Sequence, residues 1–194
     1  MSEQQQDVIF RKASLIRLIL MDVDGVLTDG KVYFVPDGHG GLFETKCFDT
    51  QDGLAFHWLH AAGIGTGVIS GRKSPVVEER ARQGHFTYVY QGYLEKIPIV
   101  EEILKLSGLR PEEVAYIGDD LTDIVVMRRV GLAVAPANAR PEVKLVADAV
   151  TEAVGGHGAV RELAEWVLKA QGFWDDILRK YEVTTEDPSA KYAR

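Results

Sequence analysis

The chain has 194 residues, of which 46% are hydrophobic, so it is long enough for one domain with a sizeable core and has an ordinary soluble globular composition. A formal net charge of -7 argues against a nucleic-acid partner, and no apolar run approaches the roughly 20 residues that span a membrane. The single cysteine, Cys47, excludes an internal disulfide, and the polar N-terminus carries no signal-peptide pattern, so we expect a cytoplasmic protein.

The first predicted element is an apolar strand over residues 18–21, which leads directly into two aspartates, Asp22 and Asp24. Side chains of a strand alternate in direction, so carboxylates two positions apart point the same way until the chain turns. Gly25 then allows an immediate turn. Carboxylates at the end of a buried strand are costly unless they bind a cation or take part in chemistry. A solvated aspartate pair is the simpler alternative, and signals further along the chain argue against it.

A β-hairpin is predicted next. Two β-rich runs, residues 31–35 and 42–46, flank a glycine-rich turn, so the hairpin spans residues 31–47. A lone hairpin is only marginally stable. Its apolar side chains also need burial: Val32, Phe34 and Phe43. The pattern leaves open whether other subunits or the chain's own domain bury them.

From residue 52 onward, strand-like and helix-like segments alternate. Strands are predicted at residues 65–69, 88–90, 114–117 and 132–135. Helices are predicted over residues 52–62, 121–129 and about 160–168. A further helix is predicted to follow Ser74 as its cap, with Pro75 in the first helical position. Another is predicted to begin at residue 97 and to end at Gly108. This alternation predicts a Rossmann-like, doubly wound α/β fold with a mostly parallel sheet and a hairpin insertion. We expect one domain over residues 1–181, followed by a polar tail over 182–194.

Polar residues also follow the later strands. Ser70 ends the strand predicted at 65–69, and a hydroxyl beside backbone N–H groups can bind a phosphate oxygen. Lys96 stands near a helix start, where the helix dipole disfavours a cation. Asp119 and Asp120 again put paired acids directly after a strand. Because ligands of open α/β sheets bind at the carboxyl ends of the strands, we expect these side chains to converge.

Four signals therefore follow one another along the chain: Asp22-x-Asp24, Ser70, Lys96 and Gly118-Asp119-Asp120. Their order resembles the motifs of the haloacid dehalogenase superfamily of phosphotransferases. The resemblance implies that Asp22 attacks phosphorus to form an aspartyl-phosphate and that Asp24 is the general acid and base. It implies that Asp22, Asp119 and the backbone carbonyl of Asp24 bind Mg²⁺. It also implies that Ser70 and Lys96 stabilise charge on the phosphoryl oxygens.

The hairpin replaces the cap domain that many members of this superfamily insert at the same place. The chain is most similar to the capless, tetrameric 3-deoxy-D-manno-octulosonate 8-phosphate phosphatases. The matching segments include residues 22–30, 70–73, 90–92, 115–121 and 158–162. The resemblance implies a phosphomonoester hydrolase acting on a keto-deoxy sugar phosphate in lipopolysaccharide synthesis. It also implies a homotetramer in which the hairpins of four subunits join.

The same resemblance implies which residues meet the anionic sugar. These are Asp52, Gly53, Arg72, Arg80, Lys96 and Asp120. Arginines suit such a site because their planar fork matches a carboxylate bidentately. Asp120 and Asp123 are expected to orient Lys96 or to contact substrate rather than to bind the metal.

The chain departs from the family pattern at three positions. Gln51 and His57 stand where the family often has arginines, and His157 replaces another near the end. Fewer positive charges around the sugar leave a second substrate open, a 2-keto-3-deoxy-nonulosonate 9-phosphate of the sialic-acid type.

Three other classes of protein share parts of this pattern. A glycosyltransferase with an Asp-x-Asp motif is disfavoured by the small chain and by Lys96. A non-catalytic oligomerising module is disfavoured by the intact pair Asp22 and Asp24, and a phosphoacceptor receiver domain has no role for Asp24. A phosphatase remains the leading interpretation.

Overall fold

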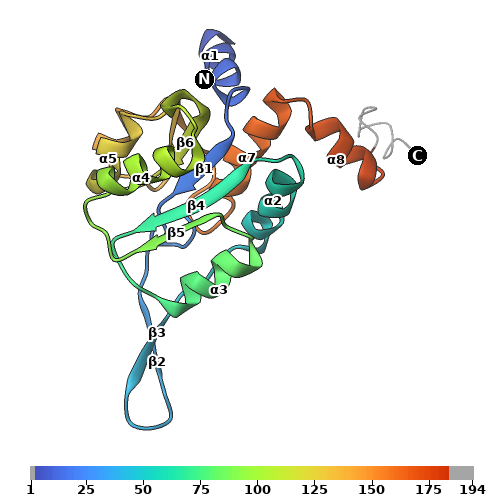
Figure 1. Cartoon of the computed structure of the whole chain (residues 1–194). Coiled ribbons are helices and arrows are strands. Elements are labelled where there is room, and N and C mark those ends of the chain that lie inside the picture. The colour runs from blue at the N-terminus through green and yellow to red at the C-terminus, as the bar shows by residue number, and fades with distance from the viewer. Residues whose placement is uncertain (1–2, 184–194) are drawn as a thin grey trace.

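The structure is a computed structural model that describes residues 3–183 (Figure 1). Its centre is a six-stranded parallel sheet with the strand order β5-β4-β1-β6-β7-β8. The strands are β1 (Leu18–Met21), β4 (Gly65–Ser70), β5 (Tyr88–Gln91), β6 (Val114–Ile117), β7 (Leu132–Ala135) and β8 (Ala149–Val150). The helices are α1 (Glu3–Ala13), α2 (Thr50–Ala61), α3 (Pro75–Gln83), α4 (Ile97–Ser107), α5 (Leu121–Met127), α6 (Pro141–Lys144), α7 (Ala159–Ala170) and α8 (Trp174–Lys180), with a short 3-10 helix η1 (Pro111–Glu113). The predicted doubly wound α/β fold is confirmed.

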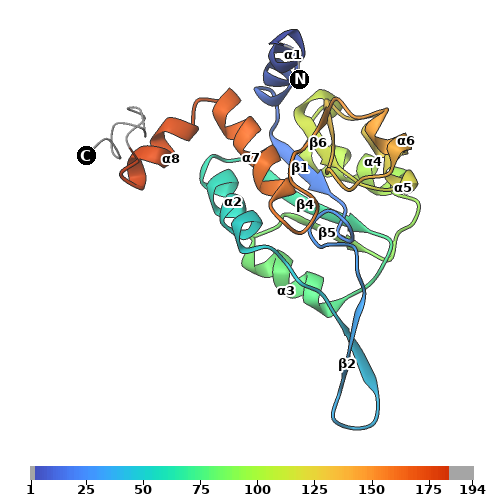
Figure 2. The same cartoon turned by 180° about the vertical axis from the view of Figure 1, so that it is seen from behind.

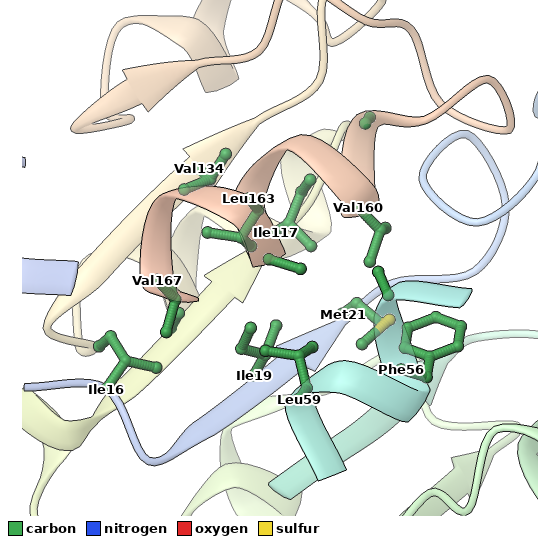
Figure 3. Close-up of a cluster of buried hydrophobic side chains, with 14 of the residues drawn as sticks. Ile16, Ile19, Met21, Phe56, Leu59, Ile117, Val134, Val160, Leu163 and Val167 are labelled. Carbon is green, nitrogen blue, oxygen red and sulfur yellow. The ribbon is translucent and has the colours of Figure 1, made fainter. Parts of the chain in front are cut away.

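Helices cover both faces of the sheet because the central strands are apolar on both faces. Ile19 and Met21 of β1 belong to a cluster shared with α1, α2 and α7, whereas Leu18 and Leu20 belong to a second cluster shared with α4, α5 and α6. Figure 3 shows the first cluster, in which side chains of α2 and α7 meet over Ile19 and Met21. All four residues of β1 are buried. The buried strand therefore fixes the backbone position of Asp22, the residue that follows it.

Most predicted elements lie within one residue of the observed ones. The helix after Lys96 ends at Gly108, whose φ of 69° is the left-handed conformation that glycine adopts without strain. The helix predicted over 121–129 is shorter and ends at Met127. Five of the described elements were not predicted: α1, η1, α6, β8 and α8. The predicted tail lies outside the described residues apart from its first two, 182 and 183.

The predicted cap at Ser74 is wrong in one respect. Ser74 holds the extended conformation of an N-cap, and Pro75 begins α3 as expected. Its hydroxyl, however, makes no capping hydrogen bond and is buried without a partner among residues 3–183. The backbone N–H of Ser74 instead donates to the side chain of Gln91 at 2.8 Å, which ties the start of α3 to β5.

The hairpin projects away from the rest of the chain (Figures 1 and 2). It consists of β2 (Tyr33–Pro36) and β3 (Leu42–Thr45), paired antiparallel with Val35 opposite Phe43. Six of its apolar side chains are exposed: Val32, Tyr33, Phe34, Val35, Leu42 and Phe43. The chain's own domain therefore does not bury them. Within residues 3–183, no helix combines the length and the apolar character needed to cross a bilayer.

Candidate active site

The candidate site lies at the carboxyl edge of the parallel sheet. Asp22 directly follows β1, and its backbone N–H donates to the carbonyl of Ile117 at the end of β6 at 3.0 Å. Asp119 follows β6 after one glycine, and Ser70 is the last residue of the neighbouring β4. Parallel strands that lie side by side bring these three residues to one edge, as the sequence pattern predicts.

Lys96 enters this edge from the start of α4. Its ammonium donates to Oδ1 of Asp22 at 2.7 Å, to Oδ1 of Asp123 at 2.6 Å and to the hydroxyl of Tyr116 at 3.0 Å. The lysine is only 2% exposed. Burial by itself lowers the pKa of Lys96, but the charges of Asp22 and Asp123 outweigh that effect and the pKa is raised. Lys96 is therefore a fixed, buried cation beside the Asp22 carboxylate.

Three carboxylates gather next to this lysine. One oxygen from each of Asp22, Asp119 and Asp123 lies within 4.8 Å of the others. Burial, opposed in part by the charge of Lys96, raises the pKa of Asp22 to about 6. Burial and the charges of Asp22 and Asp123 raise the pKa of Asp119 to about 7. So much negative charge in one place is stabilised when a cation joins it.

The residues of the site fit a divalent cation. Oδ1 of Asp119 is buried and accepts no hydrogen bond within the described part of the chain. Asp123, by contrast, accepts from Lys96 and Tyr116 on one oxygen and from the backbone N–H groups of Asp119 and Asp120 on the other. Asp123 is therefore occupied as a hydrogen-bond acceptor, and Asp22 and Asp119 are the carboxylates suited to an oxygen-seeking ion such as Mg²⁺.

The turn after β1 lies directly against the second of these acids. Gly25 has a φ of 89°, and a Cβ on this residue would collide with the carboxylate of Asp119. The carbonyl of Gly25 accepts from Nδ2 of Asn138 at 2.9 Å, and a Cβ on Gly155 would collide with the same carbonyl. The backbone of this turn is thus held between two neighbouring loops, with no room for a side chain.

Asp24 lies on the same turn and meets cations from two directions. The ammonium of Lys46 contacts its Oδ1, and Nε of Arg72 lies 3.9 Å from its Oδ2. Lys46 belongs to the base of the hairpin and is buried. Sequence reasoning missed this lysine. The available signal was its position two residues after Glu44 in an extended run, which places both side chains on one face.

Comparisons with known proteins identify the family. A model of haloacid dehalogenase-like hydrolases matches residues 77–163. The 3-deoxy-D-manno-octulosonate 8-phosphate phosphatase KdsC of Escherichia coli (strain K12) is 42% identical over 168 residues, which cover 87% of this chain and 87% of that protein. This chain belongs to that phosphatase family. The protein is therefore an enzyme of the haloacid dehalogenase-like type, as the sequence resemblance predicts.

Solved structures of similar phosphatases agree with this assignment. The 3-deoxy-D-manno-octulosonate 8-phosphate phosphatase of Yersinia pestis has a TM-score of 0.83 at 40% identity, covering 87% of this chain and 89% of that chain. The phosphatase of Moraxella catarrhalis, solved with magnesium ion, phosphate ion and KDO, has a TM-score of 0.85 at 36% identity. That match covers 89% of this chain and 97% of the other.

In this phosphatase, the remaining predicted residues fall into two groups. Ser70 and Arg72 lie at the site: the hydroxyl of Ser70 accepts from the backbone N–H of Arg72 at 3.2 Å, and the Arg72 guanidinium contacts Glu44. A hydrogen bond from Arg72 lowers the pKa of Glu44. Asp120 caps α5 and accepts from the N–H of Leu121 at 2.7 Å. None of these contacts tests the predicted roles toward phosphate or sugar, which stay predictions.

Arg80, Gly53 and Asp52 form the second group. The Arg80 guanidinium donates to the carbonyl of Asp49 at 2.6 Å and lies against Gly53, where a Cβ would sit 2.9 Å from Nη1. Gly53, His57 and Arg80 line a cavity of about 300 Å³. His57, which stands where the family often has an arginine, therefore lies beside Arg80, and the predicted contacts of these residues with the sugar stay predictions.

Asp52 has a contact that the sequence did not predict. Its side chain is fully buried, and Oδ1 accepts from the backbone N–H of Arg161 at 2.7 Å, near the start of α7. Burial raises the pKa of Asp52 to about 6. The carboxylate thus joins α2 to α7, and its predicted contact with substrate stays a prediction.

Proposed function

We propose that the protein hydrolyses 3-deoxy-D-manno-octulosonate 8-phosphate to 3-deoxy-D-manno-octulosonate and phosphate, with Mg²⁺ and through an aspartyl-phosphate intermediate. The observation that carries this proposal is the Lys96 ammonium at 2.7 Å from Asp22, with an Asp119 oxygen in the same cluster that accepts no hydrogen bond from residues 3–183. The names of the curated relatives support the substrate. The magnesium ion, phosphate ion and KDO in the Moraxella catarrhalis structure support the cofactor and the product.

Asp22, Asp119 and the backbone carbonyl of Asp24 would hold the Mg²⁺ ion. When bound, the ion offsets the repulsion between an anionic carboxylate nucleophile and an anionic phosphate. The Lys96 ammonium adds a second positive charge beside Asp22 and is fixed there by Asp123 and Tyr116. Preorganised charge of this kind lowers the barrier to phosphoryl transfer because it needs no rearrangement during the reaction.

The proposed reaction has two displacements. An oxygen of Asp22 attacks phosphorus in line, so an Asp22–phosphorus bond forms while the bond from phosphorus to the sugar oxygen breaks. Asp24 gives its proton to that leaving oxygen. Asp24 then takes a proton from a water molecule, which attacks phosphorus and releases phosphate and free Asp22. Ser70 and Lys96 stabilise the phosphoryl oxygens in both steps.

Two sugar phosphates compete as substrates under this proposal. Arg72 and Arg80 favour an anionic sugar. His57, in the cavity beside Arg80, stands where the family often has an arginine and leaves the nine-carbon 9-phosphate open as the alternative. The deciding experiment measures phosphate release from both compounds with and without Mg²⁺, with Asp24→Asn as the inactive control. Preference for the eight-carbon ester supports the proposal, preference for the nine-carbon ester replaces the substrate, and no turnover of any phosphate ester supports a non-catalytic module.

We also propose that the protein acts as a homotetramer in the cytoplasm. The exposed apolar side chains of the hairpin support assembly, because a contiguous apolar surface marks an interaction site. The single cysteine supports a reducing compartment. Sedimentation of the wild type and of Phe34→Ser tests the assembly. A tetramer that the substitution dissociates is the expected result, and a wild-type monomer would refute it.

A further inference from the structure

Four charged side chains form a closed ring where the hairpin meets the sheet. The Lys46 ammonium contacts the Asp24 carboxylate and lies 3.3 Å from Oε1 of Glu44. The Arg72 guanidinium contacts the other oxygen of Glu44, and its Nε lies 3.9 Å from Oδ2 of Asp24. Positive and negative groups alternate around the ring, so each charge has an opposite charge on both sides.

The ring joins parts of the chain that are far apart in sequence. Asp24 follows β1 and Arg72 follows β4, so both belong to the carboxyl edge of the sheet. Glu44 lies in β3, and Lys46 comes directly after that strand. The hairpin therefore reaches Asp24 through the last residues of its returning strand.

The two cations of the ring differ in burial. The side chain of Lys46 is 1% exposed, whereas that of Arg72 is 48% exposed. An ammonium that is buried without an opposite charge is strongly unfavourable, so Lys46 is held to Asp24 and Glu44. Arg72 is free to turn toward an anionic substrate, because exposed side chains change rotamer within nanoseconds. Lys46 is thus the permanent partner of Asp24, and Arg72 the exchangeable one.

We propose that Lys46 is a positioning residue that holds the Asp24 carboxyl group in the orientation for proton transfer to the leaving group. This inference rests on the proposed function, in which Asp24 protonates the sugar oxygen. Lys46 engages Oδ1 of Asp24, which leaves Oδ2 for the reacting group once Arg72 has turned to substrate. A proton donor must lie about 2.6–3.2 Å from the atom that it protonates, and a displacement of about 1 Å costs roughly 100-fold in rate.

Substrates with different leaving groups distinguish a role of Lys46 in positioning Asp24 from a role in the stability of the fold. A sugar oxygen is a poor leaving group and needs a proton as its bond to phosphorus breaks, whereas p-nitrophenolate leaves without one. Loss of Asp24 positioning therefore slows the release of the sugar much more than the release of p-nitrophenol, whereas the later hydrolysis of the aspartyl-phosphate is common to both esters. Damage to the fold, to the hairpin or to assembly slows both reactions alike.

The experiment compares Lys46→Met with wild type on 3-deoxy-D-manno-octulosonate 8-phosphate and on p-nitrophenyl phosphate, both with Mg²⁺. We expect the single-turnover rate of sugar release from the sugar phosphate to fall about 100-fold, and the single-turnover rate of p-nitrophenol release to fall less than about threefold. Release of the leaving group is measured because it precedes the hydrolysis of the aspartyl-phosphate, which both esters share. Lys46→Arg should restore part of the lost rate. Lys31→Met is the matched control, because Lys31 also belongs to the base of the hairpin but has a 74% exposed side chain outside the ring.

Equal losses in the rate of leaving-group release from the two esters, or no loss on either, would overturn the positioning role. If Lys46→Met does not fold, as judged by thermal unfolding, Lys46→Gln replaces it, and the same selective loss is expected. Absence of turnover of both esters by the wild type would overturn the proposed function itself, and the role of Lys46 with it. A selective loss in a wild-type background that hydrolyses both esters supports the inference.

Discussion

The parallel sheet and the hairpin of this chain treat apolar side chains in opposite ways. Every residue of β1 is buried between two layers of helices, whereas Phe34 and Leu42 of the hairpin are 62% and 66% exposed. One region therefore folds by burying its own surface, and the other presents surface for a partner. The candidate site lies on the border between them, because Asp24 comes from the sheet and Lys46 from the hairpin.

The sheet side of this comparison carries the chemistry, so the largest effect is expected at Asp22. Replacement by Asn removes the nucleophilic oxygen but keeps the size of the side chain. We expect phosphate release to fall by at least about 10,000-fold. A steady-state assay measures the loss, and thermal unfolding of the same sample shows that the fold persists. Activity within tenfold of wild type would remove Asp22 from the mechanism.

The sheet side also carries the stability of the single chain. Ile19→Ala leaves a cavity between β1 and the layer of α2 and α7, and we expect it to lower the free energy of unfolding by about 2–5 kcal/mol. Urea unfolding followed by circular dichroism measures the change. A cost below about 1 kcal/mol would show that the layers close around the lost side chain.

The buried carboxyl group of Asp52, which joins α2 to α7, makes the stability of the region around the sheet depend on pH. Burial raises the pKa of Asp52 to about 6 from its usual value of 3.8, so between these values the folded chain holds a proton that the unfolded chain has lost. Stability contributed by this group is therefore lost as the pH rises through that window. Relative to Asp52→Asn, the wild type should lose about 3 kcal/mol of unfolding free energy between about pH 4 and pH 7. Urea unfolding of both proteins at several pH values tests this, and a difference independent of pH would contradict it.

The smallest effect on the single chain is expected at the hairpin. Phe34→Ala removes a large apolar side chain, as many core substitutions do, but this side chain is already exposed in the single chain. Unfolding at a concentration low enough to separate the subunits should change by less than about 0.5 kcal/mol. A cost equal to that of Ile19→Ala would abolish the contrast between hairpin and sheet.

Local patterns were sufficient to predict five of the six strands of the sheet and the acids that follow β1 and β6. An apolar run followed by Asp22 and Asp24 specifies a buried strand with an acidic end, whatever packs around it. Gly108 marked the end of α4 because its left-handed conformation is a local property. Asp123 was expected to orient Lys96 or to contact substrate, and the structure places it 2.6 Å from that ammonium.

The rest depends on contacts between distant segments. Tyr116 reads as a core residue of β6, and only the approach of α4 gives its hydroxyl a partner in Lys96. Lys46 reads as an ordinary strand lysine until the hairpin is seen to return past Asp24. The bond from Arg161 to Asp52 joins residues 109 positions apart, which no local pattern encodes.

Gly25 shows that an inert residue can set the geometry of a reactive one. The Asp119 carboxylate occupies the space that a side chain on Gly25 would fill. The loop that carries Asp22 and Asp24 can therefore lie this close to the loop that carries Asp119 only because residue 25 is a glycine. A survey that ranks positions by charge or reactivity would pass over it. A mutation of Gly25 to alanine would push the Asp119 carboxylate away from Asp22 without replacing either acid. All the aspartates would then still be present in an enzyme that no longer works.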